Sequence, residues 1–185
     1  MAYTSATIDL GTKAPSFALI DTASDTLVSL ADVTSMKATV IMFICNHCPY
    51  VQHILDEILE LAREYEAKGV KFVAISSNDT MASPQDGPQH MKALALDYEF
   101  PFPYLYDQTQ QVARLYQVEC TPEFFVYDGN LTLRYHGQFD DARPNNDKPV
   151  TGKDLRAALD ALLRKQEVPQ DQIPSVGCSV KWRMS

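Results

Sequence analysis

Residues 38–51 read Ala-Thr-Val-Ile-Met-Phe-Ile-Cys-Asn-His-Cys-Pro-Tyr-Val, and this stretch decides the fold. Its first part, Ala38 to Ile44, is rich in β-branched and aromatic side chains, which predicts a strand buried on both faces. After Pro49 the apolar residues recur at helical spacing, with charged residues between them. These apolar positions are Val51, Ile54, Leu55, Ile58, Leu59 and Ala62. The stretch therefore predicts a strand that leads directly into an amphipathic helix, with two cysteines at the junction.

The residues that follow predict a second strand beside the first. Gly69 is the usual type of residue for a left-handed helix end, and residues 70–76, Val-Lys-Phe-Val-Ala-Ile-Ser, form another apolar run. A strand, a helix and a strand in this order normally make a right-handed parallel crossover.

The rest of the chain predicts further strands and helices around that unit. We expect a hairpin-like entry over residues 11–30, a helix opened by Pro88, and a short helix capped by Asp107 that carries Val112, Leu115 and Tyr116. A hairpin follows over residues 123–135 with Asp128-Gly129-Asn130 at its turn, and then a last helix capped by Thr151. This order predicts a single α/β domain over residues 1–185, a mixed sheet flanked by helices, with an irregular C-terminal tail at 167–185.

Composition narrows the classes of binding partner and the cellular compartment of the protein. The 185 residues carry a formal net charge of −8 and are 45% hydrophobic, which fits one soluble domain and opposes binding to nucleic acid or to anionic membranes. No apolar run is long enough to span a bilayer. Residues 1–5, Met-Ala-Tyr-Thr-Ser, lack a secretory signal pattern, so we expect a cytoplasmic protein.

Cys45 and Cys48 are the candidate catalytic residues. A helix begins beside them, and its unpaired N–H groups and dipole stabilise a thiolate. A spacing of three residues also lets the two sulfur atoms form a disulfide. We expect Cys45 to be the more exposed residue and the attacking thiolate, and Cys48 to resolve the mixed disulfide. As an imidazolium, His47 would favour the thiolate and make the couple more oxidising.

Two alternatives for the cysteine pair carry less weight. A zinc site would need a second close pair of ligands, whereas Cys120 and Cys178 are isolated, and we expect neither a metal nor a cofactor. Two inert cysteines with an accidental spacing are the other alternative. Cys120 and Cys178 could act as additional redox thiols that resolve an oxidised Cys45, or they could be a buried small side chain and an idle tail thiol. Asp140 and Asp141 are expected to be solvated loop charges.

Four segments resemble the thioredoxin-like superfamily, in its redoxin branch with the peroxiredoxins and the TlpA/ResA-type reductases. They are residues 11–19 (GTKAPSFAL), 43–49 (FICNHCP), 102–107 (FPYLYD) and 121–128 (TPEFFVYD). The resemblance implies that Thr121-Pro122 is a cis-proline loop that faces the cysteines and offers backbone groups to an extended substrate chain. Where the family often has tryptophan before the first cysteine, this chain has Ile44. No clear match exists for the buried acid that assists the second cysteine.

The sequence favours a thiol–disulfide oxidoreductase acting on a protein or small-molecule disulfide, with a thiol electron donor. A peroxiredoxin-like peroxidase with Cys45 as the peroxidatic thiol is the first alternative. Peroxiredoxins carry Pro-x-x-x-Thr/Ser-x-x-Cys, whereas Ala38 and Met42 hold the two corresponding positions here, which opposes that activity. A non-enzymatic redox sensor or binding module is the second alternative.

Overall fold

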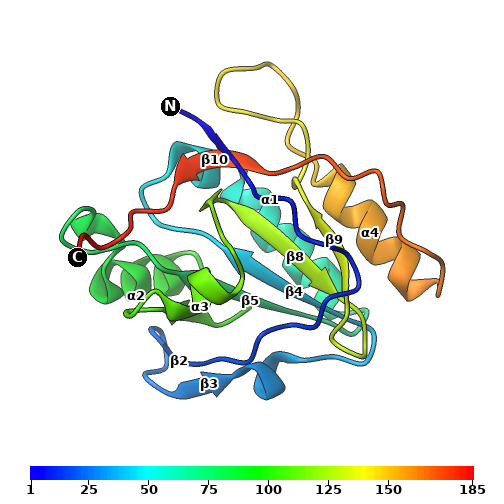
Figure 1. The fold of residues 1–185 in the computed structure, drawn as a ribbon, viewed down its shortest axis with the longest axis horizontal. Helices are drawn as coiled ribbons and strands as arrows, with labels where there is room; N and C mark the ends of the chain where they lie inside the picture. The colour runs from blue at the N-terminus through cyan, green and yellow to red at the C-terminus, as the bar shows by residue number, and fades with distance from the viewer.

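Seven strands form a mixed sheet at the centre of the molecule (Figure 1), and the computed structural model describes residues 1–185. They are β2 (Ala18–Asp21), β3 (Leu27–Ser29), β4 (Ala38–Phe43), β5 (Val70–Ser76), β6 (Tyr104–Tyr106), β8 (Glu123–Tyr127) and β9 (Leu133–Gly137), in the order β3-β2-β6-β5-β4-β8-β9. Strands β4, β5 and β6 are parallel, and the other neighbours are antiparallel. A second sheet has the order β1-β10-β7, with β1 at Tyr3–Thr4, β7 at Cys120–Thr121 and β10 at Val176–Ser179.

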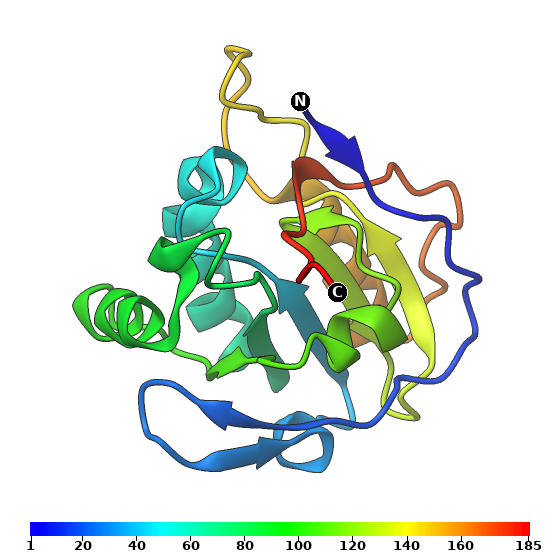
Figure 2. The ribbon, with the colours of Figure 1, turned by 60° about the vertical axis from the view of Figure 1, so that its left-hand side comes forward.

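Helices cover both faces of the seven-stranded sheet (Figure 2). The helices are α1 (Pro49–Glu66), α2 (Pro88–Asp97), α3 (Gln111–Leu115) and α4 (Lys153–Leu163), with 3-10 turns η1 (Leu30–Val33) and η2 (Pro84–Asp86). Side chains of β4 alternate between two apolar clusters: Val40 and Met42 pack with α1, α2 and α4, whereas Ile41 and Phe43 pack with α3 and η1. None of the helices combines the length and the apolar composition needed to cross a bilayer.

The strand–helix–strand unit at the heart of the fold is confirmed. Every residue of β4 is at most 1% exposed, and β4 pairs in parallel with β5 from Ala38 opposite Val70 onward. Helix α1 starts at Pro49, and the chain turns back through Gly69 at a φ of +92°. Because the strand is central and the crossover is parallel, the first turn of α1 lies at the carboxyl end of β4.

The predicted hairpins and the helix opened by Pro88 are also present. Strands β8 and β9 pair around the turn at residues 128–130, and β2 pairs with β3. The entry hairpin is part of the main sheet, because Ile20 of β2 pairs with Tyr106 of β6. Gln110 is the residue that precedes α3, but the Asp107 carboxylate accepts hydrogen bonds from the backbone N–H groups of Val112 and Ala113 in its first turn.

Three local expectations are wrong. Gly152, at a φ of +66°, precedes α4 in place of Thr151 as the capping residue. Of the three apolar residues expected on the short helix, Val112 and Tyr116 are buried, but Leu115 is 58% exposed. The tail is not irregular throughout, because residues 176–179 form β10, which pairs with β1 and β7 in the smaller sheet.

Replacing Leu159 with alanine tests the packing of α4. Leu159 is fully buried in the cluster between α1, α4 and the sheet, so we expect Leu159→Ala to lower the free energy of unfolding by about 2–5 kcal/mol. Urea denaturation measures this loss. Leu115→Ala is the matched control and should change stability by less than about 0.5 kcal/mol; equal losses in the two variants would contradict this packing.

Candidate active site

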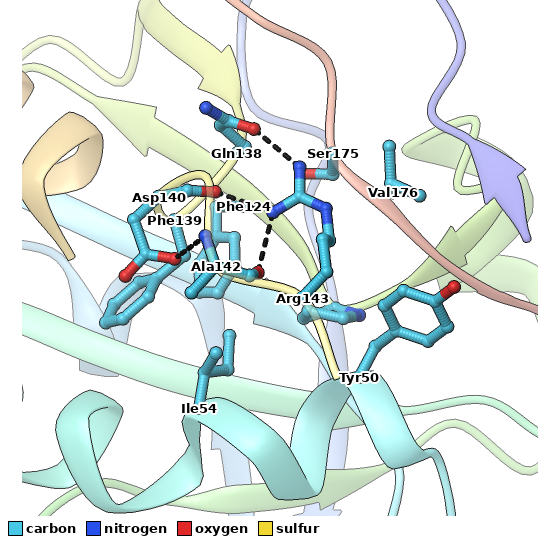
Figure 3. A pocket seen from close by; sticks show the side chains of 11 residues that line it. Tyr50, Ile54, Phe124, Gln138, Phe139, Asp140, Ala142, Arg143, Ser175 and Val176 are labelled. Carbon is cyan, nitrogen blue, oxygen red and sulfur yellow. Dashed lines mark hydrogen bonds between the residues drawn. The ribbon is translucent and has the colours of Figure 1, made fainter. Parts of the chain in front are cut away.

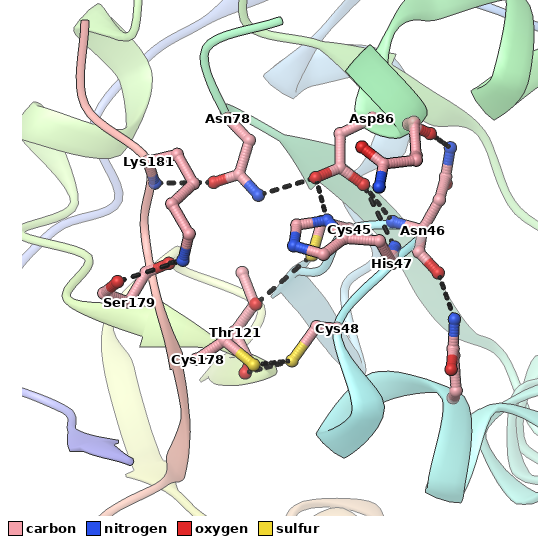
Figure 4. A network of polar contacts seen from close by, with 12 residues as sticks. Cys45, Asn46, His47, Cys48, Asn78, Asp86, Thr121, Cys178, Ser179 and Lys181 are labelled. Atoms are coloured by element: carbon pink, nitrogen blue, oxygen red, sulfur yellow. Dashed lines mark hydrogen bonds and ion pairs between the residues drawn. The ribbon is translucent and has the colours of Figure 1, made fainter. Parts of the chain in front are cut away.

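The two cysteines lie on a turn between β4 and α1. Cys45 follows the strand, and Cys48 is the capping residue that precedes the helix at Pro49 (Figure 4). The thiols of Cys45 and Cys48 are neighbours, and each shifts the pKa of the other. The pair therefore sits where the unpaired N–H groups of the helix begin, as the sequence predicts.

The carboxylate of Asp86, at the end of η2, holds this turn in place. It is fully buried, and its Oδ1 accepts hydrogen bonds from the backbone N–H groups of Asn46 at 2.8 Å and His47 at 3.1 Å. Its Oδ2 pairs with Nδ1 of His47 and accepts a hydrogen bond from the side-chain amide of Asn78. A buried carboxylate with this many donors is well satisfied, so the turn has little freedom to move.

The loop before β8 closes the other side of the turn. The Thr121–Pro122 peptide bond is cis, which confirms the expectation from the resemblance. The hydroxyl of Thr121 lies 3.5 Å from Sγ of Cys45, and the carbonyl oxygen of the same residue lies 3.3 Å from Sγ of Cys48. This loop therefore contacts both sulfur atoms.

Neither sulfur is open to solvent, which corrects the expectation that Cys45 is the more exposed. Cys45 is 1% exposed and Cys48 is 0% exposed. The sequence placed Cys45 on an open strand-to-helix turn, but the loop at Thr121 and strand β10 lie over that turn (Figure 4). Both come from distant parts of the chain.

The two thiols differ in their electrostatic surroundings. The neighbouring Cys45 thiol, more than any other group, lowers the pKa of Cys48 to about 5 against the effect of burial. The neighbouring Cys48 sulfur, burial and the nearby Asp86 carboxylate raise the pKa of Cys45. These directions favour a thiolate on Cys48, the capping residue beside the helix N–H groups, over the Cys45 thiolate that the sequence predicts.

His47 lies beside the pair, as its place in the motif requires. Its imidazole is about one quarter exposed and pairs through Nδ1 with Asp86, so its direction is fixed by that carboxylate. One ligand atom each from Cys45, His47 and Asp86 lie within 4.8 Å of one another. A structural zinc site uses four protein ligands, and both oxygens of Asp86 already accept hydrogen bonds. We propose no metal here.

The other two cysteines differ sharply in their surroundings. Sγ of Cys178, on β10, lies 2.7 Å from Sγ of Cys48. The Cys120 thiol is buried and hydrogen bonds to Glu123 and to the carbonyl of Ser175, both at 3.9 Å. Burial and Glu123 raise the pKa of Cys120. The structure therefore brings Cys178 to the site and leaves Cys120 among groups that keep its thiol protonated.

A family model for AhpC/TSA proteins matches residues 10–136 of the sequence. This chain belongs to the AhpC/TSA family. The match spans most of the chain and includes both cysteines of the motif and the Thr121–Pro122 loop. A thiol-based redox function, as an oxidoreductase or a peroxidase, follows from this membership and from the thioredoxin-like fold.

Solved structures agree with the family. An uncharacterized conserved protein of Geobacillus kaustophilus is 53% identical, with a TM-score of 0.98, and the similarity covers 100% of this chain and 98% of that one. A thiol:disulfide interchange protein of Chlorobium tepidum TLS is 17% identical, with a TM-score of 0.63 over 85% and 99% of the two chains. Peroxidoxin BcpB of Mycobacterium tuberculosis is 19% identical, with a TM-score of 0.62 over 86% and 98%. The last two establish the thioredoxin-like fold. The comparison with curated proteins finds no match.

Two buried acids of this AhpC/TSA protein were missed by sequence reasoning. Glu123 is fully buried, pairs with His136 at 2.7 Å, and accepts a hydrogen bond from the backbone N–H of Cys120. Glu123 thus anchors the loop that carries Pro122. A charged residue at the start of an apolar strand was a usable signal for Glu123. Asp86 had no such signal, because it lies in a polar stretch that reads as an ordinary turn.

A narrow cleft opens beside the Pro122 loop (Figure 3). Its volume of about 20 Å³ suits a water molecule rather than a substrate. Arg143 lines it and donates to the carbonyl oxygens of Asp140 and Ala142 and to Oε1 of Gln138. Asp140 is 1% exposed and accepts backbone hydrogen bonds at the start of α4, so the expectation of a solvated charge is wrong for this residue.

Titration of the reduced protein tests the position of the thiolate. With a pKa of about 5, Cys48 should be roughly 99% ionised at pH 7 and should lose its charge as the pH falls through 5. Absorbance of the thiolate at 240 nm measures this transition. Cys48→Ser should lack it and Cys120→Ala should keep it; a wild-type protein without any thiolate below pH 7 would contradict the assignment.

Removing the charge of Asp86 should act on the other thiol. Because that carboxylate helps to raise the pKa of Cys45, Asp86→Asn should lower the pH at which Cys45 becomes half-reactive toward iodoacetamide, as mapped by mass spectrometry. Asp25→Asn is the control, since Asp25 is an exposed partner of Lys92. An unchanged midpoint in Asp86→Asn would show that the carboxylate has no electrostatic effect on Cys45.

Proposed function

We propose that this protein is a thiol–disulfide oxidoreductase that cycles between the Cys45/Cys48 dithiol and the corresponding disulfide. The observation that carries the proposal is the placement of both thiols at the start of α1, each in contact with the Thr121–Pro122 loop. A thiolate is the form that attacks a disulfide, and a second thiol within reach completes the exchange.

The exchange takes two steps. The Cys48 thiolate attacks one sulfur of a substrate disulfide, a mixed disulfide forms, and the other substrate sulfur leaves as a thiolate. Cys45 then gives its proton to that thiolate or to water and attacks Sγ of Cys48, and the second substrate sulfur leaves as a thiolate that takes a proton from water. Two electrons have passed to the substrate, and the Cys45–Cys48 disulfide remains.

The first step also makes the Cys45 thiol more acidic, as its attack in the second step requires. While Cys48 is a thiolate, its hydrogen bond and its charge both raise the pKa of Cys45. Once Cys48 has entered a mixed disulfide, that charge is gone, and the Cys45 thiolate becomes easier to form. The resolving thiol thus stays protonated until it is needed.

The substrate in this proposal is a protein or small molecule that contains a disulfide, and a thiol donor regenerates the dithiol without a cofactor. We place the protein in the cytoplasm, where thiols are kept reduced. The Thr121–Pro122 loop, which contacts both sulfur atoms, is the surface against which the substrate chain lies.

A thiol peroxidase is the second candidate, because the AhpC/TSA family match covers the reactive turn. Its support at the site is weaker. The nearest hydroxyl, that of Thr121, contacts Cys45 rather than the Cys48 thiolate in the hydrogen-bond geometry. The Arg143 guanidinium donates to groups of its own loop and to Gln138, rather than to the sulfur atoms.

Reduction of insulin disulfides in the presence of dithiothreitol tests the proposed activity. We expect the wild-type protein to accelerate precipitation of the insulin B chain, and Cys45→Ser and Cys48→Ser to lose that acceleration. Cys120→Ala should retain it. Consumption of hydrogen peroxide, measured in parallel by stopped flow, would favour the peroxidase if it proceeded while insulin reduction failed.

The same variants separate the roles of the two cysteines. Cys45→Ser should accumulate a mixed disulfide on Cys48 with a disulfide substrate, because the attacking thiol remains and the resolving thiol is absent. A mixed disulfide that accumulated on Cys45 in Cys48→Ser, and not in Cys45→Ser, would reverse the assignment of attacker and resolver.

A further inference from the structure

Strand β10 lies directly beside the loop that contacts the catalytic sulfurs. It pairs antiparallel with β7, so that Cys178 is opposite Thr121 and Ser179 is opposite Cys120. This pairing brings Sγ of Cys178 to 2.7 Å from Sγ of Cys48 (Figure 4). A disulfide needs about 2.05 Å between its sulfur atoms, so a small side-chain movement would bring the two together.

Gly177 allows β10 to come this close. A Cβ atom at this position would lie 1.8 Å from the carbonyl oxygen of Thr121 and 2.6 Å from its carbonyl carbon. Both neighbours are backbone atoms and cannot rotate away, so only glycine permits the approach.

The tail is fastened on both sides of Cys178. Before it, the backbone of Ser175 exchanges hydrogen bonds with Ser5. After it, the backbone N–H of Val180 donates to the carbonyl oxygen of Glu119, and Lys181 bonds through its backbone to Asn78 and Asp79. Anchors on both flanks place the Cys178 side chain over Cys48 as part of the folded structure.

We propose that Cys178 is a third redox thiol, and that β10 occupies the place of a substrate chain beside Thr121–Pro122 while Cys178 exchanges with the Cys45–Cys48 disulfide at Sγ of Cys48. The proposal rests on the proposed function, which supplies that disulfide. In the exchange the Cys48–Cys178 bond forms as the Cys45–Cys48 bond breaks. The proton of Cys178 passes to Cys45, and no net oxidation or reduction occurs.

The contacts of Cys48 fit this exchange. Its sulfur lies 2.7 Å from Sγ of Cys178 and is also the neighbour of the Cys45 thiol, so Cys48 is the cysteine placed to pair with either of the other two. The neighbouring Cys48 thiolate and burial hold the pKa of Cys178 at about 12. Oxidation of Cys48 removes that charge and makes the Cys178 thiolate easier to form.

The exchange has a consequence for access to the site. In the reduced protein the docked strand covers Cys48, which is 0% exposed, so an external substrate must displace β10. When Cys48 is bonded to Cys178, the tail is locked over the site and Cys45 is left as a free thiol. The Cys48–Cys178 disulfide is therefore a closed, oxidised form of the protein.

Peptide mapping of the oxidised protein tests the proposal. Reduced wild-type protein is oxidised with one equivalent of diamide, blocked with N-ethylmaleimide and digested with trypsin without reduction. The sequence places Cys45 and Cys48 together in peptide 38–63, Cys120 in 115–134 and Cys178 in 166–181. A bond between Cys45 and Cys48 stays within peptide 38–63, whereas a bond between Cys48 and Cys178 joins peptides 38–63 and 166–181.

We expect the wild-type protein to give both products and Cys45→Ser to give the joined peptides alone. Absence of the joined peptides from oxidised Cys45→Ser would overturn the proposal. The proposed function is assessed separately in Cys178→Ser, where failure to form the internal disulfide of peptide 38–63 would count against the Cys45/Cys48 couple and not against the role of Cys178.

Gly177→Ala provides a variant that retains every cysteine. The added methyl group should push β10 away from Thr121 and lower the yield of the joined peptides by roughly tenfold or more, because the effective concentration of Cys178 at Cys48 falls. The internal disulfide of peptide 38–63 should still form. Ser179→Ala, on the same strand, is the control and should leave the yield unchanged; an equal yield in Gly177→Ala and the wild type would contradict the role of strand docking.

Discussion

The buried carboxylate of Asp86 is the constraint on which the reactive turn depends. It accepts hydrogen bonds from two successive backbone N–H groups of the turn, at Asn46 and His47, and also pairs with the imidazole of His47. Removing a buried charge from water is costly unless each lone pair finds a donor. The turn supplies those donors, so its geometry and the burial of Asp86 require one another. The direction of the Cys45 and Cys48 side chains follows from this arrangement.

The electrostatic surroundings of the two thiols differ and shift their pKa values in opposite directions. Cys45 is buried next to the Asp86 carboxylate, whereas Cys48 precedes α1 and contacts the carbonyl oxygen of Thr121 and the thiol of Cys178. The same carboxylate that fixes the turn thus disfavours a thiolate at Cys45, and the start of the helix favours one at Cys48. In the proposed cycle this division sets the order of events, because the protonated thiol becomes reactive only after the other has lost its charge. Strand β10 adds a third sulfur in contact with Cys48.

Much of the fold could be predicted because its signals are local. The continuous apolar run of β4 and the helical periodicity of α1 are properties of neighbouring residues, and both elements form where the sequence predicts them. Caps were harder to predict. Thr151 has a suitable side chain, but the left-handed Gly152 and the buried Asp140 hold the start of α4. The side of α3 that faces the core also depended on tertiary packing, so Leu115 was misplaced.

By itself the sequence determined the pair of cysteines at a strand-to-helix junction, the helix start beside them and, through family resemblance, the cis-proline loop. Only the tertiary structure decided which groups surround each thiol, because Asp86, Thr121 and Cys178 are distant in sequence from the motif. It also decided that the tail covers the site. Pairing between β10 and β7 joins segments more than fifty residues apart, and no local pattern of apolar residues encodes which strands meet across such a distance.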